Sequence, residues 1–152
     1  MNTAVQLTAH FSLEELTRSS YAIRQGIDNS TNDPDVLANL GMLAAALERV
    51  RTVLALPIHV DSGYRCPAVN KGVGGSKDSD HMKGLAADII CPAFGSPREI
   101  AEALVAQKEF VGYNKLIQEG NWLHVAFSDA PRYEVLTAHF GAGPTTYTRG
   151  LA

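Results

Sequence analysis

The chain has 152 residues, and its composition is that of a globular protein, with 45% hydrophobic residues, 19% charged residues and a formal net charge of −3. This length predicts a single domain, residues 1–152, with a hydrophobic core of its own. The charge balance gives no basic surface for nucleic acid and no polybasic patch for lipid headgroups, and no apolar run approaches the length of a membrane span. We therefore expect no contact with nucleic acid or with the membrane interior.

The N-terminal segment and the cysteines bear on the cellular compartment. Residues 1–10 contain no basic start followed by an apolar run, so we expect no signal peptide and synthesis in the cytoplasm. Cys66 and Cys91 stand outside any C-x-x-C pair, which disfavours a cysteine-based zinc site. We expect two unpaired thiols. Both flank the central motif region, however, so a disulfide between them is the alternative.

Three segments carry the signals of helices. Ser12 as N-cap, with Glu15 three residues later, has the spacing of a capping box and predicts a helix start. Apolar residues recur at helical spacing over residues 35–54, which predicts a long helix packed on the core. A second capping box at Ser96, with proline in the next position, predicts a helix over residues 96–110.

The segments that predict strands alternate apolar and polar residues or form short apolar runs bounded by glycine. Gly120 and Asn121 separate two such runs and predict a β-hairpin. We expect an α+β fold, a small central antiparallel sheet with flanking helices, whose core spans about residues 11–127. The tail after Ser128 is expected to be irregular, with one further strand or helix around residues 133–140. The predicted strands are 57–62, 84–91, 113–119 and 122–127.

Two histidines and one aspartate form the most informative set in the sequence. Asp88 lies inside the apolar run 86–90, where burying a carboxylate is costly unless it is paired or bound to a metal. His124 lies between Leu123 and Val125, and His81 follows a glycine-rich loop. Imidazole and carboxylate together suit Zn²⁺, and three protein ligands leave the fourth tetrahedral position free, as in a catalytic site. We therefore predict Zn²⁺ as the cofactor, with these three residues as its ligands.

A zinc hydrolase also needs a general base and a group that stabilises negative charge. Glu119 ends the strand that pairs with the His124 strand, and we favour it as the base over Asp80 beside His81. The other interpretation of Glu119 is an exposed glutamate at the end of a hairpin. Arg65 presents a fixed fork of donors that suits a carboxylate or an oxyanion near the metal, although a surface salt bridge is the commoner role.

Three motifs around these residues resemble one family. They are Ser62-Gly63-Tyr64-Arg65, Ser79-x-His81-x-x-Gly84-x-Ala86-x-Asp88 and Trp122-x-His124. The family is that of the zinc D-Ala-D-Ala carboxypeptidases and L-alanyl-D-glutamate endopeptidases, within the LAS metallopeptidases, whose fold also includes the hedgehog signalling domain. Upstream, residues 11–16, 26–29 and the helix around Asn39 resemble its phage and prophage branch, so the resemblance covers roughly residues 11–127.

The resemblance implies a site as well as a fold. It implies Zn²⁺ at the predicted three-ligand set, and it places Arg65 on the substrate carbonyl or on the transition-state oxyanion. We expect other residues of the same motifs to contact the substrate, although the commoner role of a serine such as Ser79 is to cap a turn. The expected substrate-binding residues are Arg65, Tyr64, Ser79 and Trp122.

One position departs from the family pattern. Many members carry Asp or Glu three residues before the last histidine ligand, where this chain has Asn121, which cannot act as a base. Glu119 lies two residues earlier. Either Glu119 is the base of an enzyme, or the domain binds zinc together with wall peptide or a protein partner and has weak or no hydrolase activity.

The function implied by the resemblance is a zinc-dependent peptidase that cleaves peptidoglycan stem peptides next to a D-amino acid, as a carboxypeptidase or an endopeptidase. A phage or prophage endolysin fits the expected lack of a signal peptide, because such enzymes wait in the cytoplasm for a membrane pore. A virion-associated wall hydrolase fits equally well. We expect a monomer whose partner is the peptidoglycan peptide.

Overall fold

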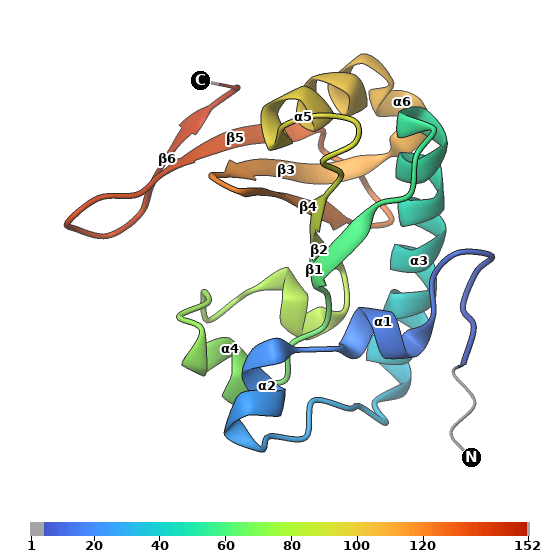
Figure 1. The fold of residues 1–152 in the computed structure, drawn as a ribbon, viewed down its shortest axis with the longest axis vertical. Coiled ribbons are helices and arrows are strands. Elements are labelled where there is room, and N and C mark those ends of the chain that lie inside the picture. The colour runs from blue at the N-terminus through green and yellow to red at the C-terminus, as the bar shows by residue number, and fades with distance from the viewer. Residues whose placement is uncertain (1–4, 152) are drawn as a thin grey trace.

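The computed structural model describes residues 5–151, which form one six-stranded sheet with helices packed around it (Figure 1). The strands are β1 (His59–Ser62), β2 (Ala86–Ile90), β3 (Tyr113–Glu119), β4 (Trp122–Phe127), β5 (Glu134–His139) and β6 (Thr146–Arg149). Their order in the sheet is β1-β2-β4-β3-β5-β6. Neighbouring strands are antiparallel except β3 and β5, which run parallel. The expected α+β class is confirmed, and the parallel pair is the departure from the antiparallel sheet that we predicted.

The long helix expected over residues 35–54 is α3 (Pro34–Leu54), which runs along one side of the sheet (Figure 1). It begins where the Asp33 side chain accepts the N–H of Asp35 and where Pro34 fits the first turn. Its inner side contributes a row of fully buried leucines to the core. The other helices are α1 (Leu13–Thr17), α2 (Ser20–Gln25), α4 (Pro67–Gly72), the 3₁₀ turn η1 (Asp80–Lys83), α5 (Pro97–Ala106) and α6 (Lys108–Val111).

The two faces of the central strands differ in chemistry. Ala87 and Ile89 of β2 lie in the hydrophobic core, as do Leu123 and Val125 of β4, and α3 and α5 contribute to that same core. Successive side chains of a strand point to opposite faces of the sheet, so the intervening residues face away from this core. One of those intervening residues is Asp88, and the fold therefore gives the polar residues of β2 and β4 a common face.

Several local predictions are confirmed with changes. Ser12 caps α1 by accepting the N–H of Glu15, and a complete capping box begins α5 at Ser96. The helix expected over residues 96–110 is interrupted at Gln107, whose ψ of 33° departs from helical values, and it continues as α6. Gly120 has a φ of 72° in the two-residue connection of the β3–β4 hairpin, a conformation that glycine adopts without strain.

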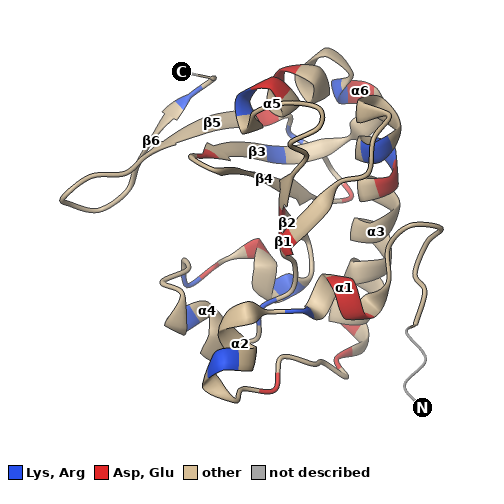
Figure 2. Cartoon of the chain, viewed as in Figure 1, with Lys and Arg blue, Asp and Glu red and all other residues tan. Residues whose placement is uncertain are grey.

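The C-terminal tail is more regular than we expected. Two strands, β5 and β6, add a hairpin to the sheet beyond β3 (Figure 1). Lys, Arg, Asp and Glu lie mainly on helices and loops elsewhere in the chain, and this hairpin carries none of them between Glu134 and Arg149 (Figure 2).

The two cysteines are unpaired, as expected, with Cys91 buried and Cys66 half-buried.

Candidate metal centre

The register of the central sheet brings two of the predicted ligands together. Asp88 of β2 lies directly opposite His124 of β4 in the antiparallel ladder, and residues opposite each other share a face. The Asp88 Oδ1 atom lies 3.1 Å from His124 Nδ1. Both side chains are buried, on the face of the sheet away from the hydrophobic core. The sheet itself therefore sets the geometry of this pair.

The third ligand, His81, comes from η1. Ser79 caps this turn by accepting the N–H of His81, and Gly84 ends it in the left-handed conformation. The His81 ring is buried, and its Nδ1 lies 2.7 Å from the carbonyl oxygen of Gly63. A carbonyl oxygen only accepts hydrogen bonds, so Nδ1 carries the proton and Nε2 is the atom free to bind a metal in the neutral ring.

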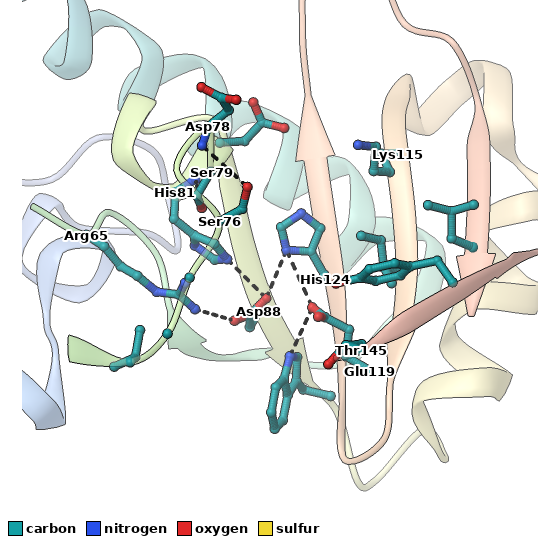
Figure 3. A pocket seen from close by; sticks show the side chains of 18 of the residues that line it. Arg65, Ser76, Asp78, Ser79, His81, Asp88, Lys115, Glu119, His124 and Thr145 are labelled. Carbon is teal, nitrogen blue, oxygen red and sulfur yellow. Dashed lines mark hydrogen bonds and ion pairs between the residues drawn. The ribbon is translucent and has the colours of Figure 1, made fainter. Parts of the chain in front are cut away.

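The three side chains fit a tetrahedral zinc ion. His81 Nε2 lies 3.3 Å from Asp88 Oδ1, and the ligand atoms of the whole set lie within 4.8 Å of one another (Figure 3). Zinc bonds of about 2.0–2.1 Å in a tetrahedral arrangement place neighbouring ligand atoms about 3.3 Å apart. The distances from Asp88 to both imidazoles match that spacing. His81, Asp88 and His124 could therefore hold zinc and leave one position open toward the cavity that they line.

The electrostatics of the set favour an ionised aspartate. Burial alone would raise the pKa of Asp88, but the interactions of its carboxylate with His124 and His81 outweigh burial and hold the pKa well below its usual range. The carboxylate is therefore charged at neutral pH without help from an ion. A metal that binds here meets its anionic ligand already deprotonated, which removes one of the proton-release costs of metal binding.

Arg65 lies beside the ligand set and is held by several side chains. Its Nη2 donates to Asp88 Oδ2 at 3.2 Å, and its Nε donates to Ser62 Oγ at 3.1 Å. Its Nη1 lies 3.4 Å from Asn70 Oδ1, and its backbone N–H donates to the carbonyl of His81. These contacts fix the guanidinium fork at one edge of the site (Figure 3). They also make Arg65 a partner of the metal ligand Asp88.

Glu119 lies at the other edge of the set. Its Oε1 is 3.7 Å from His124 Nδ1 and accepts a hydrogen bond from Trp122 Nε1 at 3.3 Å. Burial raises the pKa of the Glu119 carboxyl, partly offset by His124. Asp80, the other candidate base, also lines the cavity, but its nearest charged partner is Lys83 at 3.9 Å. The geometry therefore favours Glu119 over Asp80. Its side chain is 19% exposed, which argues against the alternative of an exposed glutamate at the end of a hairpin.

The ligand set opens into a cavity of about 610 Å³. Ser79 and Trp122, both predicted to contact substrate, line it together with Arg65. Tyr64, which was also expected to contact substrate, does not line this cavity. Its backbone N–H donates to the carbonyl of Leu16, and its ring packs in the hydrophobic core. A second cavity of about 250 Å³ shares Arg65, Asp88 and Trp122 with the first and continues toward α2 and β1.

Two buried asparagines support the site and were not predicted. Asn29 donates through Nδ2 to the carbonyls of Thr17 and Tyr64, and its Oδ1 accepts the N–H of Cys66. It thereby fixes the backbone on both sides of Arg65. Asn70 accepts from Arg65 and donates to the carbonyl of Ser76 in the glycine-rich loop. The segment 26–29 carried a signal through its resemblance to the phage branch, whereas nothing in the sequence marked Asn70.

Among the helices of residues 5–151, none is both long enough and apolar enough to cross a membrane.

Residues 9–126 match the family model described as Peptidase M15, and this span contains the three-ligand set together with Arg65 and Glu119. No curated protein matches the chain. M15 peptidases depend on zinc, in agreement with the ligand geometry, and the match extends over well more than half of the sequence. The chain belongs to the Peptidase M15 family of metallopeptidases.

Proposed function

We propose that this chain is a zinc-dependent peptidase that cleaves peptidoglycan stem peptides next to a D-amino acid. The observation that carries the proposal is the position of Glu119, whose carboxylate lies 3.7 Å from His124 beside the three-ligand set. A carboxylate in this place can exchange protons with the groups that react there. The family supports peptidase chemistry, and the motif resemblance described above supports the choice of substrate.

The metal site and Glu119 have different roles in the proposed reaction. Zinc held by His81, Asp88 and His124 would polarise a substrate carbonyl and lower the pKa of a water molecule, so that hydroxide is available as the nucleophile. Glu119 accepts a proton from the attacking water and later donates it to the leaving amine. Burial raises the pKa of this carboxyl, which suits a group that must both accept and donate a proton near neutral pH.

Arg65 is placed to stabilise negative charge on the substrate. Ser62, Asn70 and Asp88 engage three of its five N–H groups. Among the described residues, the other two N–H groups have no partner, and the side chain lines the cavity. A guanidinium that is already fixed in place can donate to a carbonyl oxygen as charge develops on it, with little reorganisation.

Two cavities that share Arg65, Asp88 and Trp122 favour cleavage of an internal bond. One cavity extends from the ligand set toward β5 and β6, and the other extends past Arg65 and Trp122 toward α2 and β1. A peptide chain can therefore continue on both sides of the bond that is cut. We accordingly favour an endopeptidase, which should cleave stem peptides with an amidated C-terminus as well as those with a free carboxylate. A carboxypeptidase would lose the amidated peptides as substrates.

The biological setting that we propose is bacterial wall degradation by a phage or prophage enzyme. The support is the resemblance of residues 11–16 and 26–29 to that branch. In this setting the protein acts as a monomer and reaches the wall through a membrane pore or as part of a virion.

The alternative of a binding module without hydrolase activity rested on Asn121. The hairpin connection that contains Asn121 places Glu119 beside His124, so the proposed enzyme has a candidate base although Asn121 is not one. This geometry favours the enzyme over the binding module.

The test is digestion of purified peptidoglycan with and without a zinc chelator, alongside a measurement of metal content. We expect one zinc per chain, a chelator-sensitive loss of turbidity, and released peptides whose masses identify the bond. Zinc at one equivalent with no peptide released from any peptidoglycan type would refute the enzyme and favour the binding module.

A further inference from the structure

The β5–β6 hairpin forms a wall of the metal-site cavity although it lies outside the segment that matches the family. The match ends at residue 126, and the hairpin begins at Glu134. It extends from the sheet beyond β3 (Figure 1). Leu136, Phe140, Thr145 and Tyr147 of this segment line the same cavity as the metal ligands. Thr145 and Glu119 are both seen at the edge of that cavity in Figure 3.

The register of the hairpin decides which side chains face the cavity. Ala138 pairs with Tyr147, so their side chains share one face, and Phe140 follows on that face because side chains alternate along a strand. His139 and Thr148 lie on the opposite face, where His139 Nε2 and Thr148 Oγ1 are 2.8 Å apart. The hairpin therefore lines the cavity with a mainly apolar and aromatic face, on which Arg149 lies opposite Leu136 without lining the cavity.

Two aromatic side chains on this wall are unusually open. Phe140 is 59% exposed and Tyr147 is 51% exposed. Phe140 lies over the β3–β4 turn, since a Cβ atom placed on Gly120 would be 3.6 Å from its Cε2. Burial, and then the negative charge of Glu119, raise the pKa of the Tyr147 phenol, so its hydroxyl keeps its proton and can donate a hydrogen bond. Both rings are thus positioned close to the residue next to that turn, Glu119.

The chemistry of this face restricts what it can bind. Residues 135–148 contain no Lys, Arg, Asp or Glu (Figure 2), whereas Arg65, Asp78 and Lys115 lie elsewhere on the cavity wall (Figure 3). Open aromatic rings gain from covering by apolar groups, and a phenol hydroxyl suits a backbone carbonyl. The fitting occupant is an uncharged, apolar peptide segment, and the alanyl residues of the proposed substrate are of this kind.

We propose that the β5–β6 hairpin is a substrate-binding arm of the peptidase, in which Phe140 and Tyr147 hold the uncharged, alanine-bearing part of the peptide against the cavity. This inference rests on the proposed function, because it assigns the binding surface for that substrate. The arm acts on binding, and the proton transfers stay with Glu119. Its loss therefore raises KM and leaves kcat nearly unchanged.

The chain provides a direct readout of binding, because its single tryptophan, Trp122, lines both cavities. The experiment uses the zinc-loaded full chain and the synthetic stem pentapeptide N-acetyl-L-Ala-D-Glu-L-Lys-D-Ala-D-Ala amide, in which both alanine-bearing ends are uncharged. Steady-state cleavage gives kcat and KM, and Trp122 fluorescence in a Glu119→Gln background gives Kd without turnover. The variants are the double substitution F140A/Y147A and the single Tyr147→Phe. The controls are Phe110→Ala, an exposed aromatic residue on α6 outside this cavity, and Thr146→Ala on the opposite face of the hairpin.

We expect F140A/Y147A to raise KM and Kd about thirtyfold or more, because it removes two aromatic contacts worth about 0.5–1.5 kcal/mol each together with the Tyr147 hydroxyl. Tyr147→Phe should raise both about fivefold if the hydroxyl binds a carbonyl. Both controls should match the wild type, and thermal unfolding should show that every variant is folded. Wild-type KM and Kd in F140A/Y147A would overturn the inference, and so would an equal effect of Phe110→Ala or Thr146→Ala. If the pentapeptide binds in a way that depends on the hairpin but is not cleaved, the result would support the hairpin as a binding arm and refute the peptidase activity.

Discussion

The metal centre and the β5–β6 hairpin line the same cavity but are built in opposite ways. Asp88 is 4% exposed and His81 is 3% exposed, and each is held by partners from other segments. Phe140, which follows β5, and Tyr147 of the edge strand β6 are both more than half exposed. The comparison indicates that the reactive groups are fixed by the fold, whereas the aromatic groups of the hairpin are left free to be covered by a ligand.

The largest effect is expected from the substitution of one of the buried metal ligands. Asp88→Asn should abolish stoichiometric zinc binding and reduce peptidase activity to background, because the carboxylate is the anionic ligand that contacts both imidazoles. Metal analysis and peptide release measure both effects. Asp129→Asn, at an exposed aspartate, should leave them unchanged. Full zinc content in Asp88→Asn would remove Asp88 from the ligand set.

The second change separates chemistry from metal binding. Glu119→Gln keeps the shape of the side chain but removes its ability to accept a proton, so kcat should fall by about 10²–10⁴-fold. Zinc content should stay at one per chain, because Glu119 lies beside the ligands without belonging to the set. Glu109→Gln on α6 serves as the matched control at an exposed site. A variant with full activity and full zinc would exclude Glu119 from the mechanism.

The third change tests whether the metal centre depends on the hydrogen bonds that Asn29 makes to the backbone around Arg65. Asn29→Ala removes three hydrogen bonds and leaves buried backbone groups without partners around Arg65, so it should lower the free energy of unfolding by about 2 kcal/mol. Denaturant unfolding measures this loss. Asn39→Ala removes one exposed bond, to the carbonyl of Lys83, and should cost less than about 1 kcal/mol. Equal losses in the two variants would contradict the supporting role of Asn29.

The smallest effect is expected from a substitution in the β3–β4 turn, which lies between the metal centre and the β5–β6 hairpin. Gly120 and Gly26 have positive φ angles of 72° and 66°, and an added Cβ meets at most ordinary contacts at either position. Alanine at either position should therefore cost about 1 kcal/mol of stability from backbone strain alone. Gly120→Ala should in addition raise KM, because Phe140 of the hairpin lies over this turn. Steady-state kinetics with an unchanged KM would place the turn outside the binding surface.

The sequence identified the parts of the site whose signals are local. An aspartate within an apolar strand and a histidine in the partner strand of a glycine-turn hairpin are visible as patterns, and the structure places both in the expected strands. The supporting role of Asn29 could not be predicted, because its hydrogen-bond partners lie 12, 35 and 37 residues away in the sequence. Such contacts depend on tertiary packing, which no local pattern reports.

Two further differences have physical causes. The glycines and the proline at residues 141–144 resemble an irregular tail, and they obscured the connection of a hairpin whose strands pair only in the folded sheet. Tyr64 was expected in the substrate site because it belongs to the family-like motif Ser62-Gly63-Tyr64-Arg65. The close approach of Gly63 to the Leu16 carbonyl draws this segment against α1, and the Tyr64 ring is buried in the core.

The pairing of Asp88 with His124 also orders the events that lead to an active molecule. These residues are 36 positions apart, and they meet only when β4 has docked on β2 in the correct register. A strand displaced by one residue would turn His124 toward the opposite face and disassemble the ligand set. The complete ligand set therefore exists only in a chain whose β2 and β4 have paired, and the melting temperature should rise with zinc concentration because the unfolded chain has no such site.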